Sequence, residues 1–174
     1  MRLLAASLAG LLALSLASLA ALALDFPALT GRVVDQADII GPVLADVAAK
    51  SKDLEERSTI QLVVATVATL QGSSIEAYAT QLFNTWRLGR ADKNNGVLLL
   101  VAPNERKVRI EVGYGLERRL TNEICAFIIQ DDVLPHFRQG DFAGGVTQGV
   151  EGIIRVLEAD KGEWQPLSPE QTTR

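Results

Sequence analysis

The sequence predicts an α/β protein, and more specifically an α/β/α sandwich built around a small mixed sheet. Apolar, nearly uncharged stretches typical of strands alternate with stretches whose apolar residues recur at helical spacing. The last two strand-like stretches are separated by only four residues, which is typical of a hairpin. Alternating strands and helices produce parallel pairs, whereas a hairpin is antiparallel, so the sheet is expected to be mixed with helices on both faces.

The first half of the chain predicts two helices around one strand. A helix over 42–57 begins with proline, which suits a first helical turn, and a buried strand follows over 60–67. Ser73 and Glu76 have the spacing of a capping box and predict the start of a second helix. Gly89 is expected to end that helix.

The second half predicts the hairpin and two further helices. The stretch 97–102 is wholly apolar, whereas 107–112 alternates charged and apolar residues, so one face of this second strand is expected to be solvated. Thr121 or Asn122 is expected to cap the next helix. Glycines recur in the last helix, over 142–157, and are expected to permit close packing against the sheet.

The N-terminal residues predict export. A positively charged start precedes an uncharged Leu/Ala run over 3–22, and residues 21–23 have the small-x-small pattern of a signal peptidase site. We expect cleavage after Ala23 and a mature protein in the periplasm or cell envelope. An uncleaved membrane anchor is the alternative, because about 20 apolar residues span a bilayer. The folded domain is expected over 24–159, with a polar, flexible tail over 160–174.

The composition restricts the chemistry. A net charge of −4 and a pI near 5.1 argue against nucleic acid as a partner. A single Cys excludes an intramolecular disulfide and a Cys-based zinc site. The motifs of common hydrolases and phosphate-binding loops are absent. We expect Cys125 to be a buried, inert thiol, and we expect no functional role for His136, the only histidine.

One loop is a candidate cation site. Asp92, Asn94 and Asn95 place three side-chain oxygens just before a buried strand, and hard cations such as Ca²⁺ or Mg²⁺ prefer such ligands. The alternative is a turn whose side chains bond to its own backbone. The hairpin should bring this loop close to residues 113–122. The expected edge therefore comprises Asp35, Asp92, Asn94 and Asn95, with Glu117 and Asn122 as possible additions.

The sequence Gly113-x-Gly115 follows the second hairpin strand. We interpret it as a tight exit from the strand, with positive φ angles or a close backbone approach. A phosphate or another anion is expected to contact free backbone N–H groups here, beside Arg118 and Arg119.

The stretch WRLGRADKNNGVLLLVAPNERKVRIEVGYGLE, over 86–117, resembles the central signature of the TPM domain family, as does GRVVDQAD at 31–38. The resemblance extends over 26–158 and implies the same α/β/α sandwich. Proteins of this family include exported bacterial proteins, thylakoid proteins linked to photosystem repair and animal membrane-associated modulators.

The resemblance also implies a divalent-cation edge, with Ca²⁺ or Mg²⁺ bound by Asp and Asn side chains at Asp35, Asp92, Asn94 and Asn95. Acid phosphatase activity is attributed to some chloroplast members. The chain departs from the family pattern at Asn122, where many relatives have Asp, and residues 160–174 contain neither the membrane span nor the Gly-rich tail of many bacterial relatives.

These observations favour a non-catalytic accessory module of the envelope that maintains or assembles a membrane complex. Its expected partner is an envelope or membrane protein complex, with no nucleic acid and no organic cofactor. The alternative is a metal-assisted acid phosphatase, in which a cation polarises a phosphoryl oxygen and Asp92 or Asp35 orients water or acts as general base.

Overall fold

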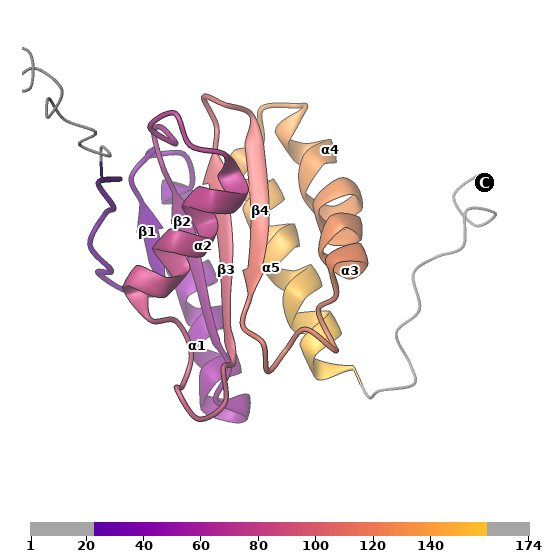
Figure 1. The fold of residues 1–174 in the computed structure, drawn as a ribbon. Coiled ribbons are helices and arrows are strands. Elements are labelled where there is room, and N and C mark those ends of the chain that lie inside the picture. The colour runs from indigo at the N-terminus through magenta and orange to yellow at the C-terminus, as the bar shows by residue number, and fades with distance from the viewer. Residues whose placement is uncertain (1–22, 160–174) are drawn as a thin grey trace, which may run out of the picture.

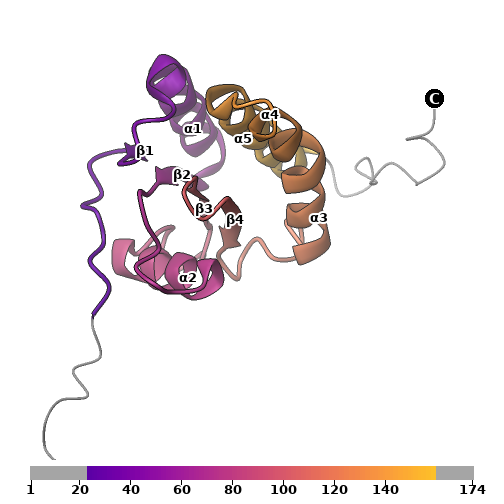
Figure 2. The same ribbon diagram turned by 90° about the horizontal axis from the view of Figure 1, so that it is seen from above.

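The computed structural model describes residues 23–159, which form a four-stranded sheet between two layers of helices (Figures 1 and 2). The strands are β1 (Val33–Asp35), β2 (Gln61–Thr66), β3 (Gly96–Ala102) and β4 (Lys107–Val112). The predicted α/β/α sandwich with a small mixed sheet is confirmed.

The sheet has the strand order β1-β2-β3-β4. The first three strands are parallel, and β4 runs antiparallel to β3. Asp35 is aligned with Thr66, and Thr66 with Val101, whereas Gln61 is aligned with Gly96. We call the end of the sheet at which β1, β2 and β3 finish the upper end, and the end at which β2 and β3 begin the lower end, as they lie in Figure 1.

The helices cover both faces of the sheet (Figure 2). One face packs against α2 (Ile75–Trp86), and the other packs against α1 (Leu44–Ser58) and α5 (Phe142–Glu158). A continuous helical run lies beside β4, with a π-helical turn at its centre. The remaining helical segments are η1 (Gly41–Val43), α3 (Asn122–Phe127), η2 (Ile128–Val133) and α4 (Leu134–Phe137).

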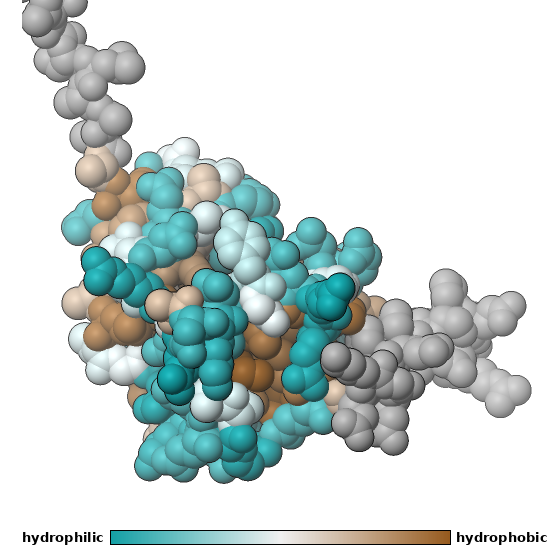
Figure 3. Space-filling view, turned by 60° about the horizontal axis from the view of Figure 1, so that its bottom comes forward, coloured by the Kyte–Doolittle hydropathy of each residue, from teal (hydrophilic) through white to brown (hydrophobic). Residues whose placement is uncertain are grey.

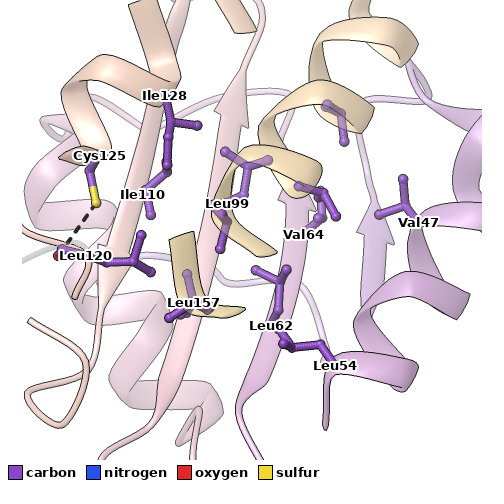
Figure 4. Close-up of a cluster of buried hydrophobic side chains, with 14 of the residues drawn as sticks. Val47, Leu54, Leu62, Val64, Leu99, Ile110, Leu120, Cys125, Ile128 and Leu157 are labelled. Carbon is purple, nitrogen blue, oxygen red and sulfur yellow. Dashed lines mark hydrogen bonds between the residues drawn. The ribbon is translucent and has the colours of Figure 1, made fainter. Parts of the chain in front are cut away.

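The core is divided by the sheet, because successive side chains of a strand point to opposite faces. Leu62, Val64 and Leu99 pack toward α1 and α5, as Figure 4 shows. Leu98 and Leu100 pack toward α2. Every residue of β3 is buried, which explains why its sequence is uniformly apolar.

The predicted helices and strands are found with small corrections. The N-cap of α2 is Ser74, whose side chain accepts a hydrogen bond from Ala77 N, so the expected capping box at Ser73 is wrong. Gly89 does not end α2, because Arg87 adopts the left-handed conformation at its C-terminus, with φ of 51°. Thr121 caps α3, as one of the two expected caps. The sequence analysis did not predict β1.

The glycines of α5 mainly allow another helix, rather than the sheet, to approach. A Cβ at Gly145 would lie 2.5 Å from the ring of Phe137, and one at Gly149 would lie 2.8 Å from Val133 Cγ2. Only the contact of Gly149 with Leu99 Cδ2, at 3.4 Å, involves the sheet. The prediction that these glycines pack against the sheet is therefore mostly wrong, because η2 and α4 lie against this face of α5.

Within residues 23–159, no helix combines the length and the apolar character needed to span a membrane. The predicted signal peptide, apart from Ala23, and the predicted C-terminal tail lie outside the described residues.

Candidate functional site

The loop before β3 is held in place by Asn95. Its Oδ1 accepts a hydrogen bond from Arg90 N at 2.9 Å, and its Nδ2 donates to Thr59 O at 2.7 Å. The residue is only 5% exposed. Because the side chain is buried and both its oxygen and its nitrogen have backbone partners, Asn95 serves the loop structure rather than a ligand. This supports the alternative interpretation of the stretch as a turn.

Asp92 and Asn94 are the exposed members of this loop. Asp92 Oδ1 lies 3.4 Å from Arg90 Nε, in a solvated ion pair. Asn94 adopts a φ of 47°, and its backbone N–H donates to Arg90 O at 2.7 Å. The side chains of Asp92 and Asn94 therefore remain accessible to a ligand. The lower end is viewed in Figure 3, where hydrophilic side chains cover most of the surface around an apolar strip.

Two glycines, Gly113 and Gly115, allow the chain that follows β4 to contact the loop before β3. Gly115 N donates to Asn94 O at 3.0 Å, and Gly113 N donates to Gly96 O at 2.9 Å. A Cβ on Gly113 or Gly115 would collide with the carbonyl oxygens of Asn94 and Lys93, respectively. The expected approach of the two segments is confirmed, and the glycines serve close backbone contact rather than positive φ angles.

Glu117 and Asn122 line a separate hollow. It has a volume of about 290 Å³ and lies beside β4, where Arg109 and Glu111 also line it. Arg109 Nε donates to Glu111 Oε2 at 2.7 Å. Neither Asp92 nor Asn94 lines this hollow, so the expected set does not surround one space.

Asp35 lies at the opposite end of the sheet from the loop before β3, so its expected grouping with Asp92, Asn94 and Asn95 is wrong. Asp35 is aligned with the last residue of β2, whereas that loop precedes the first residue of β3. Gly96 and Val101 mark these two ends on β3 and are five positions apart, which is about 17 Å at about 3.3 Å per residue.

The carboxylate of Asp35 has a structural role. Its two oxygens accept hydrogen bonds from Ile39 N at 3.2 Å, Ile40 N at 3.0 Å and Thr66 Oγ1 at 2.5 Å. Thr66 and Thr59 were not predicted as partners from the sequence. They lie 31 and 36 residues from the side chains that they contact, so no local pattern indicates the pairing.

The expected anion contact near Arg118 and Arg119 lies in a turn whose backbone N–H groups are partly engaged. The backbone N–H groups of Gly115, Leu116 and Arg119 already donate to carbonyl oxygens. The guanidinium of Arg119 donates to Ala159 O at 3.2 Å, which leaves Arg118 as the exposed cation of this turn. The backbone N–H groups of Glu117 and Arg118 have no acceptor within the described residues, so an anion contact beside Arg118 stays a prediction.

Cys125 and His136 both make contacts within the fold. Cys125 lies among buried apolar side chains (Figure 4). It is 7% exposed, and burial raises the pKa of its thiol to about 11. Its Sγ lies 3.9 Å from Leu120 O. His136 Nδ1 lies 2.8 Å from Asp141 Oδ2, and this contact, followed by the hydrogen bond from Gly144 N, lowers the pKa of the Asp141 carboxyl. The predicted burial of the thiol is confirmed, and its low reactivity stays a prediction.

The residues present do not form one cation site from the four predicted ligands. Asp35 is remote and Asn95 is engaged, which leaves one carboxylate, Asp92, and one amide, Asn94. Nowhere in residues 23–159 do three or more His, Cys, Asp or Glu side chains form a group that could hold a metal ion. Any cation at this loop would depend largely on backbone oxygens and water for its remaining ligands.

The fold and the site define a class of protein: a small α/β/α domain that presents exposed polar loops at the lower end of a mixed sheet. The model of the TPM domain matches residues 33–156. The chain belongs to the TPM domain family.

Solved structures share this fold. The N-terminal domain of a Porphyromonas gingivalis protein is 30% identical with a TM-score of 0.69, over 74% of this chain and 83% of that one. The N-terminal domain of a Corynebacterium glutamicum protein is 17% identical with a TM-score of 0.58, over 82% and 90% of the two chains. The BA42 protein of Bizionia argentinensis is 19% identical with a TM-score of 0.57, over 65% and 77%. No curated protein sequence matches the chain.

Proposed function

We propose that this TPM domain is an exported, non-catalytic accessory module that maintains or assembles a membrane complex of the cell envelope. One observation carries the proposal: Asp35, Cys125 and His136, three side chains that hydrolytic chemistry could use, are already engaged in the fold. Asp35 accepts three hydrogen bonds, and Cys125 is buried with a raised pKa. His136 contacts Asp141, which caps α5. Export is supported by the Leu/Ala run and by the signal peptidase pattern at residues 21–23.

The proposed cation site is restricted to the lower loop. Asp92 and Asn94 supply exposed oxygens, and Glu117 follows the glycines that contact this loop. Ca²⁺ or Mg²⁺ suits these oxygen ligands. Because Arg90 pairs with Asp92, the local charge is small, and we expect a dissociation constant on the order of 10⁻⁴ to 10⁻³ M, as in extracellular calcium modules.

A metal-assisted phosphatase is the alternative proposal. It would depend on Asp92, with Arg90 and Arg118 as cations near the lower loops, because Asp35 is remote and already accepts three hydrogen bonds. A cation would supply polarisation of a phosphoryl oxygen, and Asp92 would orient water.

Deletion and complementation in the native host separate the two proposals. The accessory module predicts that one membrane assembly decreases on native gels of envelope fractions after deletion, and that wild-type protein restores it. The Cys125→Ser variant should restore it equally, because this thiol lies outside the exposed loops. Unchanged membrane assemblies, together with phosphomonoester turnover by the purified protein, would replace the module with the phosphatase.

A further inference from the structure

A pocket at the upper end of the molecule is not explained by the proposed function. It has a volume of about 580 Å³ and lies between the β3–β4 turn and α4, which are neighbours at the top of Figure 1. Its charged lining residues are Arg106, Lys107 and Arg138, and no acidic residue lines it. This volume is in the range of sites for small molecules.

The floor of the pocket is apolar. Val108, Leu134, Phe137 and Phe142 line it, and each is only partly buried. The rings of Phe137 and Phe142 lie against each other, with centroids 5.0 Å apart. Covering apolar surface that is open to water with an apolar ligand lowers the free energy. The floor therefore favours a hydrocarbon group.

The basic side chains at the rim form no ion pair with any of the described residues. Within residues 23–159, no hydrogen bond or ion pair reaches the side-chain nitrogens of Arg106, Lys107 or Arg138. Lys107 acts electrostatically on Glu76 and Glu105, neither of which lines the pocket. The rim therefore concentrates positive charge in a chain whose net charge is −4. Such a rim favours a ligand with an anionic group.

Hydrogen bonds hold both walls of the pocket. In the hairpin turn, Arg106 N donates to Pro103 O at 3.1 Å. On the other side, Asp141 N donates to His136 O at 3.0 Å, and Gly140 N donates to Phe137 O at 3.0 Å. The carbonyls at the end of α4 are thereby satisfied and do not present free acceptors to an anion. The pocket is therefore preformed, which lowers the cost of binding.

We propose that this pocket binds a single amphiphilic anion, a carboxylate or phosphate carried on a short apolar chain. The chain lies on the Phe137 and Phe142 floor, and the anionic group is held by Arg106 and Arg138, with Lys107 as the third cation. This site lies at the opposite end of the sheet from the proposed cation loop, so either proposal can fail without the other.

The test is an NMR titration of the ¹⁵N-labelled full chain with monomeric decanoate, and separately with decyl phosphate. Saturable shifts are expected for amides of residues 101–108 and 134–142. Higher salt should weaken binding, because the charges are near the surface. Decyltrimethylammonium, which has the same chain and the opposite charge, should give no saturable shift. A stronger response to decanoate or to decyl phosphate identifies the head group.

The Arg106→Gln/Arg138→Gln double variant should weaken binding about tenfold or more, because two charge-assisted contacts are lost. Lys107→Gln should weaken it less. Arg87→Gln is the matched control, since it removes an exposed arginine that follows α2 near the lower end of the sheet, and it should bind like the wild type. The proposal is overturned by non-saturable shifts, by equal affinity in the double variant, by equal binding of the cationic amphiphile, or by binding only to phosphatidylglycerol vesicles.

Discussion

The hydroxyl of Thr66 donates a hydrogen bond to Asp35 Oδ1 at 2.5 Å and thereby joins the upper ends of β1 and β2. The same carboxylate accepts the backbone N–H groups of Ile39 and Ile40, which begin the path into α1. Asp35 therefore organises a strand-to-helix connection.

Asp35→Ala should lower the free energy of unfolding by about 2 to 3 kcal/mol, because three donors lose a charged acceptor. Urea denaturation of the purified variants measures the change. Asp92→Ala is the matched control: its side chain is 65% exposed and has only a 3.4 Å ion pair, so a change within about 0.5 kcal/mol is expected. Equal effects of the two substitutions would contradict the structural role of Asp35.

The same substitution, Asn to Asp, should have opposite effects on stability at positions 95 and 122. Asn95→Asp removes the donor to Thr59 O and places a carboxylate against that carbonyl oxygen, which should cost about 2 to 4 kcal/mol. Asn122→Asp adds a negative charge at the first residue of α3, where the helix dipole should stabilise it by about 0.3 to 1 kcal/mol. Thermal denaturation distinguishes them. A stable Asn95→Asp variant would show that this amide is dispensable.

Gly115→Ala should destabilise the fold by about 1 to 3 kcal/mol, because the added methyl group collides with the carbonyl oxygen of Lys93. Gly31→Ala is the control, since a Cβ there has no atom within 4 Å, and it should be neutral or slightly stabilising. Denaturant midpoints of both variants measure the effect. If Gly115→Ala is as stable as Gly31→Ala, the close approach of the two loops is not required.

The thiol of Cys125 should react slowly in the native protein. Its pKa is about 11, so at about pH 8 only about one thiol in a thousand is ionised, and burial further limits access. Ellman's reagent should therefore react at least about a hundredfold faster in denaturing urea than in buffer. The native rate should increase as pH rises toward the pKa, because the thiolate is the reactive form. A native rate equal to the unfolded rate would contradict the burial of this side chain.

The fold was largely predictable because its signals are local. The apolar run of β3 and the stripe of α2 are each contained in a dozen residues or fewer. The strand β1 was missed because it has only three residues. That omission misplaced Asp35, since a parallel strand places its last residue at the upper end, away from Asn95.

The site was less predictable than the fold because it depends on distant partners. The role of Asn95 becomes visible only when Thr59 is placed beside it, and Asn122 faces a hollow that forms between β4 and α3. The pocket bordered by Arg106 and Arg138 joins segments that have no shared sequence pattern.

The central claim, that this TPM domain is a non-catalytic module, is tested most directly by the hydrolysis of a generic phosphomonoester. The purified chain, Asp92→Ala and Asp35→Ala are assayed at about pH 5 to 7 with excess Ca²⁺ or Mg²⁺, the range in which carboxylate-based acid catalysis is expected. The claim predicts a rate indistinguishable from the protein-free rate for all three proteins. Robust wild-type turnover that is lost in Asp92→Ala, while that variant remains folded, would contradict it.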